Sequence, residues 1–436
     1  MDSARADILA ARHQLHTRGW IPCKAEAFRH LPPPAADVWL GEESGPAAPG
    51  CEAHPLAGAG WTLHPIGHSP QGRVDARWLD AGDALQRAEL WAGLSATSGT
   101  GDAGDAAEGD AAPFGWAHRA LCRQGLRLRV GGTPGAERGR PETVWLQLRH
   151  QPRSAVEAPM LVVEVLAGVH CVLVETHDRE PVACQQAIVQ NLQTHVVLGE
   201  GATLQHLRIA TPAAADRVAH HLHARLGRGA HYAQALLASG SAYHLQRNVI
   251  ALPAEGAVAR GAGLLLAADS MLEHQVRLAH GAARTTGAIE DLVLASGSAR
   301  AVVNAHTRIA PGAAQAEVRQ RLTGIPTGGQ PKLVLRPHLE IHHDQVQATH
   351  SATWGALSEE ALFYARQRGL DERTARGLIV QGMAGALLQR CFADDALLET
   401  LDIDTLLRAA VARHLAPHRA PHRAPHLTLG TKAQHG

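Results

Sequence analysis

The sequence predicts a mainly β protein built as a parallel β-helix, a solenoid of stacked rungs, with α-helical regions on both sides. Between residues 126 and 346, short apolar runs alternate with turns rich in Gly, Ala and Pro, a pattern typical of strands. Within this stretch an aliphatic residue followed by Gly-Ala recurs at near-constant spacing. Before and after it, apolar residues recur at helical spacing.

The Gly-Ala repeat indicates rungs that turn at the same corner. Each glycine of the repeat precedes an alanine, and the intervals between them are 28, 27, 25 and 31 residues; the glycines are Gly201, Gly229, Gly256, Gly281 and Gly312. Similar turns at similar intervals favour a solenoid over a sandwich, whose loops need not repeat. Only 3 % of the residues are aromatic, so the core must be aliphatic.

Residues 1–94 are predicted to form an N-terminal helical region. One helix is expected over residues 2–18, where Ile8, Ala11 and Leu15 share a face, and another over 83–94. Residues 95–113 are small, polar and acidic without Lys or Arg, which predicts a flexible linker. The β-helix core is then expected over residues 114–353.

Residues 354–415 are predicted to be helical again. Ser358 is a suitable N-cap and Gly369 a suitable C-terminal stop for a first helix, and Asp371 can cap a second. The apolar stripe of the second helix comprises Ala375, Leu378, Ile379, Met383 and Leu387. A third helical piece is expected over 404–414. The tail, 416–436, has proline at every fourth position of its repeat, which predicts disorder.

Composition excludes several classes of function. Lys and Arg balance Asp and Glu at 41 each, which gives no argument for a nucleic-acid or membrane-surface partner. The six cysteines form no CxxC pair, which favours a reducing cytoplasm. The first residues contain no apolar core of a signal peptide, and the most apolar stretch, 155–174, contains charged residues. We therefore expect a soluble cytoplasmic protein.

The sequence contains no motif of a common enzyme class: GxxxxGK[ST], GxSxG and HExxH are absent, and no GxGxxG follows a strand, so we expect a non-catalytic protein.

One polar ladder places His338, Glu340, His342 and Asp344 on one face of a strand, which fits either a solvated face or a zinc or iron site. A cluster of histidines at 220, 221 and 223 is attributed to composition. Two alternatives stay open: a stand-alone metal-binding solenoid, and a β-helical carbohydrate-active enzyme, although no clear row of carboxylates supports the second.

The segment from 336 to 388 resembles the C-terminal core of the SufB/SufD family of iron–sulfur cluster assembly proteins. The resemblance depends on ordered matches over about fifty residues; they are Leu339-Glu340-Ile341, Asp344, Val346, His350, Ala352-Thr353, Leu362-Phe363-Tyr364, Arg368-Gly369 and Ala375. Weaker similarity extends over most of the chain. The resemblance implies a right-handed parallel β-helix between helical regions.

The residues around His350 favour the SufD branch of that family over the SufB branch. SufB members carry acids beside the corresponding histidine and a cysteine in the β-helix. Here the neighbours are Thr349 and Ser351, and no cysteine lies between Cys184 and Cys391. Ala348 stands where many SufD members have cysteine. Without a thiolate, this chain is expected to hold no cluster tightly by itself.

The resemblance also implies partners and roles. It implies a heterodimer with a SufB-like subunit, a docked SufC-type ATPase, and a transient iron–sulfur cluster shared with SufB, to which His350, in a turn before the helices, contributes a ligand. The helices after Ser358 are the expected ATPase surface, with five candidate residues: Phe363, Tyr364, Arg368, Arg373 and Met383. Flavin binding and the donors of sulfur and iron are not predicted.

Overall fold

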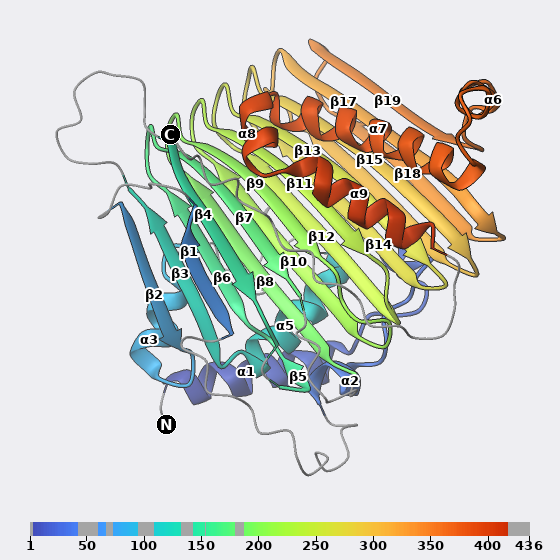
Figure 1. The fold of residues 1–436 in the computed structure, drawn as a ribbon. Helices are drawn as coiled ribbons and strands as arrows, with labels where there is room; N and C mark the ends of the chain where they lie inside the picture. The colour runs from blue at the N-terminus through green and yellow to red at the C-terminus, as the bar shows by residue number, and fades with distance from the viewer. Residues whose placement is uncertain are drawn as a thin grey trace.

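A computed structural model describes residues 3–41, 60–66, 73–94, 109–131, 143–152, 154–178 and 187–416. Its described strands form two long sheets that lie face to face (Figure 1). The nine-stranded sheet consists, in spatial order, of β1 (Trp61–Pro65), β4 (Thr143–His150), β7 (His170–His177), β9 (Thr203–Ala210), β11 (His231–Ser239), β13 (Val258–Ala268), β15 (Thr286–Gly297), β17 (Ala316–Gly329) and β19 (Val346–Trp354).

The ten-stranded sheet contains the strands that alternate with these along the chain. In spatial order they are β18 (Lys332–Ile341), β16 (Arg300–Ile309), β14 (Met271–His280), β12 (Tyr243–Leu252), β10 (Arg217–Leu226), β8 (Val189–Leu198), β6 (Met160–Val165), β3 (Gln124–Val130) and β2 (Val74–Asp80), with β5 (Val156–Glu157) beside β8. From β8 to β19 each strand pairs in parallel with the strand two places along the chain. The predicted parallel β-solenoid is therefore confirmed.

The predicted Gly-Ala turns all lie at one corner of the solenoid, where the ten-stranded sheet passes to the nine-stranded sheet. Four of the five glycines adopt a left-handed backbone, with φ between +58° and +84°; Gly281 does not. The alanine after each of these four glycines turns into the interior: Ala202, Ala230, Ala257 and Ala313 are fully buried, whereas Ala282 is only partly buried. The repeat thus marks the corner because it combines a left-handed turn with a small inward side chain.

The solenoid interior is aliphatic on the side of this corner. Inward residues of successive rungs stack there, as Leu204, Tyr232 and Ala259 do on three neighbouring strands. Farther along β7, β9 and β11, the interior also contains buried polar residues, among them Glu175, Arg208 and Gln234. On the following rungs the positions toward the opposite corner are again apolar, as at Leu265 and Val293, so the polar residues form a local cluster within an aliphatic interior.

The N-terminal region differs from the all-helical prediction. Helices α1 (Ser3–Arg18), α2 (Ala36–Leu40) and α3 (Ala84–Trp91) are present, and Asp83 caps α3 by accepting from the N–H groups of Leu85 and Gln86. However, β1 and β2 also lie there and pair antiparallel with β4 and β3, so they close the N-terminal end of each sheet. Their pairing partners are distant in sequence, which is why local periodicity does not reveal them.

The predicted boundaries near residue 113 were also wrong. Residues 95–108 of the expected linker lie outside the described residues. Residues 109–111 form a 3₁₀ turn, and α5 (Ala112–Leu121) follows where the β-helix was expected to begin. Phe114 and Ala117 of α5 are completely buried under α1 and α2, and this burial explains why the segment is ordered.

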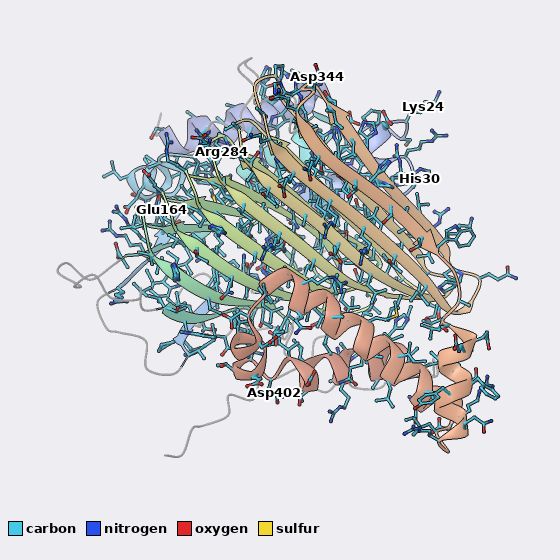
Figure 2. All side chains as sticks on the ribbon, turned by 90° about the horizontal axis from the view of Figure 1, so that it is seen from above. Lys24, His30, Glu164, Arg284, Asp344 and Asp402 are labelled. Atoms are coloured by element: carbon cyan, nitrogen blue, oxygen red, sulfur yellow. The ribbon has the colours of Figure 1, made fainter. Side chains whose placement is uncertain are left out.

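Four helices of the described chain follow the solenoid, and the last three cover the outer face of the nine-stranded sheet, on the opposite side of the solenoid from the N-terminal helices (Figure 2). They are α6 (Glu359–Gln367), α7 (Glu372–Phe392), α8 (Asp395–Thr400) and α9 (Ile403–His414). The caps Ser358 and Asp371 and the left-handed Gly369 are where the sequence predicts them. Strand β19 extends to Trp354, so the helical region begins later than predicted. The predicted tail lies outside the described residues from 417 onward.

Within the described part of the chain, no helix is both long and apolar enough to cross a membrane.

Candidate functional site

The last rung of the solenoid is formed by β18 and β19. Strand β19 pairs with β17 on one side, strand β18 pairs with β16 on one side, and no described strand lies beyond either. The other end of the sheets finishes in β1 and β2, which run antiparallel to their neighbours and likewise have a strand partner on one side only. The last rung therefore presents two unpaired strand edges and the open mouth of the solenoid interior.

His350 lies in the middle of β19 and not in the turn that the sequence predicted. Val346 and Ala348 pack against the small interior cluster around Ile309, so strand alternation places His350 on the same inward side. Its register partner on the preceding rung is Gln320, which is buried. His350 is exposed, and its side chain makes no hydrogen bond or ion pair with any described residue. Its ring is thus available at the mouth of the solenoid.

The predicted ladder of His338, Glu340 and His342 lies on the outer face of the other sheet and does not converge on one point. His342 Nε2 is 2.7 Å from Glu340 Oε1, and this hydrogen bond lowers the pKa of the carboxyl. His306, on the neighbouring strand, is 3.3 Å from the other carboxylate oxygen, whereas His338 only packs against the ring of His306. The ladder therefore forms surface ion pairs, and Asp344 lies apart in the exposed turn after β18.

Helix α6 projects beyond the end of the sheets and exposes large side chains (Figure 1). Phe363 is 59 % exposed and Tyr364 is 60 % exposed, which is unusual for aromatic residues without a partner. The guanidinium of Arg368 lies over the Tyr364 ring, 4.7 Å from its centroid. Three of the predicted partner residues thus form one exposed patch on α6.

Helix α7 carries the other two predicted partner residues on different faces. Arg373 is exposed in its first turn, close to α6 in sequence. Met383 is half-buried and packs against the core cluster under the C-terminal helices, so it offers less area to a partner. Leu378, predicted to belong to the buried stripe, is instead 52 % exposed, while Val380 and Ala384 are buried.

The described cysteines offer little thiolate. Cys122, Cys171 and Cys391 are buried, and burial raises the pKa of each thiol to about 12. Cys23 is exposed but lies in the N-terminal region. Soft ligation by a thiolate is therefore unfavourable at each buried cysteine of the described chain.

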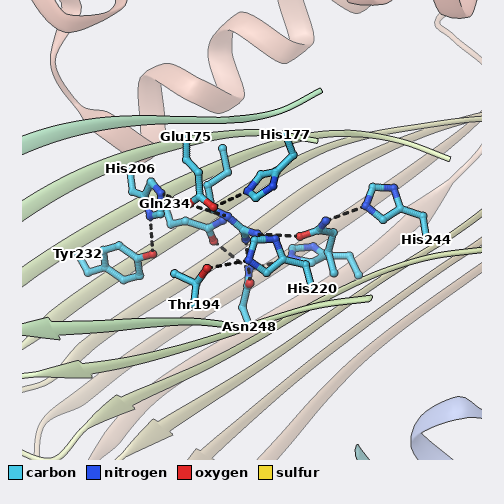
Figure 3. A network of polar contacts seen from close by, with 12 residues as sticks. Glu175, His177, Thr194, His206, His220, Tyr232, Gln234, His244 and Asn248 are labelled. Carbon is cyan, nitrogen blue, oxygen red and sulfur yellow. Dashed lines mark hydrogen bonds and ion pairs between the residues drawn. The ribbon is translucent and has the colours of Figure 1, made fainter. Parts of the chain in front are cut away.

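The sequence prediction missed a buried polar network inside the solenoid (Figure 3). It includes Glu175 and His177 of β7, His206 and Arg208 of β9, and His220 of β10. Each of these residues lies an even number of positions from inward aliphatic residues of its own strand, so the alternation of side chains along a strand could have placed it in the interior. His220 was instead attributed to composition. His221, its neighbour, is buried on the opposite face of β10, against Phe114.

Comparison with known families agrees with this architecture. The family described as "SUF system FeS cluster assembly, SufBD core domain" matches residues 148–383, which is more than half of the chain. This range contains the solenoid from the end of β4, the whole last rung, and α6 with the first half of α7.

The chain belongs to the SufBD family. This is the family that the sequence resemblance indicated, and its description assigns the family to iron–sulfur cluster assembly by the SUF system.

Curated SufBD relatives match over shorter stretches. The chain is 29 % identical over 96 residues to the iron–sulfur cluster assembly protein SufD of Escherichia coli, covering 22 % of this chain and 23 % of that protein. It is 32 % identical over 83 residues to a SufBD family protein of Synechocystis, covering 19 % and 18 %. It is 26 % identical over 98 residues to the chloroplastic protein ABCI7 of Arabidopsis thaliana, covering 22 % and 21 %. The aligned stretches span about a fifth of each relative.

Proposed function

We propose that this SufBD-family chain is a SufD-type scaffold subunit, which pairs with a SufB-like subunit and is driven by a SufC-type ATPase. The partners would build a nascent iron–sulfur cluster, the cargo of the complex, at the interface between the two scaffold subunits. The observation that carries this proposal is the open last rung, where two strand edges and the exposed ring of His350 lie together.

The open rung supports pairing with a related solenoid. Unpaired strand edges associate readily with other strands, and proteins normally cover or blunt them. Blunting features are confined to β18, which contains Pro337 and charged residues, whereas β19 contains no proline and no Lys, Arg, Asp or Glu. Ile341 and Trp354 at the ends of the two strands are large, apolar and exposed. A SufB-like subunit with its own last rung could extend both sheets and cover these side chains.

The donor set supports a shared cluster and not one held by this chain alone. Neutral imidazole is a competent iron ligand, and His350 has no competing partner among the described residues. The buried cysteines hold their protons because burial raises their pKa values. In this proposal the SufB-like subunit supplies the thiolate, and this chain contributes the His350 nitrogen without catalysing a reaction itself.

The C-terminal helices support a mechanical link to an ATPase. The α6 patch is exposed, while the following helix α7 is anchored to the solenoid by Val380, Ala384 and Leu388. Arg390 near the end of α7 also pairs with Glu290 of β15 at 2.9 Å. A displacement of α6 by a docked ATPase would therefore pass through α7 to the nine-stranded sheet that ends in β19.

Co-expression tests this proposal. The chain, tagged, is produced with the SufB-like and SufC-like proteins encoded in the same genome, and the captured complex is weighed by native mass spectrometry. We expect one copy of this chain, one SufB-like subunit and one ATPase bound to each of them. Recovery of the chain without a SufB-like subunit, at concentrations where that subunit is folded, would contradict the proposal.

Metal analysis of the chain alone tests the alternative of a stand-alone metal protein at His338, Glu340 and His342.

A further inference from the structure

A compact set of metal-ligating atoms lies inside the solenoid, remote from the last rung. Atoms of Glu175, His177 and His220 all lie within 4.8 Å of one another. The exposed fraction is 0 % for Glu175, 8 % for His177 and 1 % for His220, so all three are more than nine-tenths buried. They come from facing strands, β7 and β10, and their rings and carboxylate converge in Figure 3.

The donors of this set are of the types that bind first-row transition metals. The Glu175 carboxylate accepts from His206 Nε2 at 2.8 Å. His220 Nδ1 accepts from Arg208 Nη2 at 2.5 Å, so this nitrogen carries a lone pair. Two histidines and one carboxylate are the ligand set of many zinc and non-haem iron sites.

One nitrogen of the set has no hydrogen-bond partner among the described residues. His177 Nε2 lies 2.5 Å from Glu175 Oε1, whereas its Nδ1 is buried without a hydrogen-bond partner. A metal between Oε1 and Nε2 would need these atoms about 3 Å apart, given bond lengths of about 2.1 Å.

The surrounding residues already hold the ligands in place. His206 Nε2 donates to Glu175 Oε2 at 2.8 Å, and the Tyr232 hydroxyl donates to His206 Nδ1 at 3.1 Å. His220 Nε2 is 2.8 Å from Thr194 Oγ1. Such outer contacts orient metal ligands and are as much a part of a metal site as the ligands themselves.

Arg208 supplies the positive charge of this network when no metal ion is bound. Its Nε is 3.6 Å from Glu175 Oε2 and has no hydrogen-bond partner among the described residues, and its Nη2 is 2.5 Å from His220 Nδ1. The guanidinium thus offsets the charge of the Glu175 carboxylate in the absence of a metal ion. A divalent cation must therefore compete with Arg208, whose guanidinium can turn toward Gln246 Oε1, which already accepts from Nη2 at 3.0 Å. This competition predicts an exchangeable site and not a tightly occupied one.

A small cavity leads to the cluster. It has a volume of about 20 Å³, which is enough for one water molecule or one ion, and both His177 and His220 line it. Asp178 and Asp216 line the same cavity at the corner where the nine-stranded sheet passes to the ten-stranded sheet. Asp178 is paired with Arg149 at 2.9 Å, so the attraction of a cation to this entrance depends on the carboxylate of Asp216.

We propose that Glu175, His177 and His220 form a binding site for a divalent first-row transition metal ion such as Zn²⁺ or Fe²⁺, with Arg208 as the cation that the metal displaces. The site does not depend on the proposed partners, because all its ligands lie in the interior of this chain.

Cobalt(II) titration of the full chain tests this inference. Co²⁺ is followed by its visible absorption and by equilibrium dialysis with metal analysis, and Zn²⁺ and Fe²⁺ are then added as competitors. All variants carry His342→Ala to remove the surface cluster at Glu340. His177→Gln removes a ligand, Arg208→Gln removes the competing cation, and His280→Gln is the matched control, a buried interior histidine on β14 outside the cluster.

We expect the parent to bind one more Co²⁺ per chain than His177→Gln does. The affinity of the parent for Co²⁺ at the interior site should be at least about tenfold higher than that of His177→Gln. Arg208→Gln should bind at least about tenfold more tightly than the parent, and metal should raise its melting temperature more. His280→Gln should behave as the parent does. If Arg208→Gln does not fold, the comparison of the parent with His177→Gln decides. Equal stoichiometry and identical spectra for the parent and His177→Gln would overturn the inference.

Discussion

His350 and Gln320 are register partners on neighbouring strands, β19 and β17, yet one is exposed and the other is buried. Gln320 is covered because a further rung follows it, and its amide donates to Thr307 Oγ1 at 2.8 Å. His350 occupies the equivalent inward position on the last rung, where no described strand follows. The same position in the repeat is thus a core position in one rung and an open site in the next, and this difference makes the last rung a candidate interface.

Replacing Trp354 with serine tests the interface at the end of β19. Trp354 is 77 % exposed, so the substitution should change the free energy of unfolding by less than about 0.5 kcal/mol. Loss of an interface tryptophan often costs about 2 kcal/mol or more, so affinity for the SufB-like subunit should fall at least about thirtyfold. Trp78→Ser on β2, which is 43 % exposed at the other end of the solenoid, is the control. Equal affinities for both variants would argue against this edge.

Charge reversal at Arg373 tests the ATPase surface. Arg373 is exposed in the first turn of α7, so Arg373→Glu should leave the melting temperature nearly unchanged and reduce co-purification with the SufC-type ATPase several-fold. Arg12→Glu, an exposed reversal on α1, controls for net charge. Undiminished recovery of the ATPase with Arg373→Glu would place its docking surface elsewhere.

Glu273→Gln tests a buried acid beneath the N-terminal segment. Burial raises the pKa of Glu273 to about 8, and its Oε1 accepts from Gln275 at 2.8 Å and from Asn304 at 3.0 Å. Between pH 4.5 and 8 the folded state keeps this proton and the unfolded state loses it, so this group makes the protein less stable as pH rises. Across this pH range, the titration of Glu273 lowers the free energy of unfolding by about 5 kcal/mol in total. Glutamine keeps an acceptor and removes the titration.

The stability of Glu273→Gln relative to the parent, measured as the free energy of unfolding, should therefore increase as pH rises from 5 to 8. Urea unfolding at these two pH values measures it, and Glu317→Gln, at an exposed position of β17, serves as the control. A difference that does not change with pH would contradict a proton held by Glu273 in the folded state.

Gly227→Ala tests the stacking of the solenoid corner. A Cβ on Gly227 would lie 2.9 Å from the carbonyl carbon of Gly199 on the rung before, and this neighbour is backbone that cannot turn aside. We expect a loss of about 1–3 kcal/mol in the free energy of unfolding. Gly385→Ala in α7 has open space around its new methyl group and should stabilise the protein by up to about 1 kcal/mol. Thermal and urea denaturation of both variants distinguish these outcomes.

Repeated local chemistry made the solenoid predictable from the sequence. Gly201, Gly229, Gly256 and Gly312 each need a left-handed backbone at the same corner, and the caps Ser358 and Asp371 act within their own helices. Strands β1 and β2 were missed because their pairing depends on partners many residues away. The order of α5 likewise depends on burial beneath α1 and α2, which composition does not reveal.

The candidate site was predictable in its residue types but not in its geometry. The residues around His350 carried the family resemblance, but its inward direction depends on the register between β17 and β19. The ladder at His338 and Glu340 looked like a metal site because strand alternation puts its donors on one face, yet the side chains form surface pairs with His306 and Arg308. The interior cluster could not be seen in the sequence because it depends on the pairing of β7 with β9 and on β10, in the opposite sheet, facing them across the solenoid.

The most direct test of the central claim is the replacement of His350 by alanine in the complex with the SufB-like subunit and the ATPase. Iron–sulfur cluster assembly in vivo is measured by the activity of an iron–sulfur enzyme, with the amount of intact complex determined in parallel. The exposed position predicts an intact complex and unchanged stability, and loss of an iron ligand predicts at least about tenfold less cluster assembly. Normal assembly by an intact complex would contradict the role of His350 and of the open rung as the site where the cluster is built.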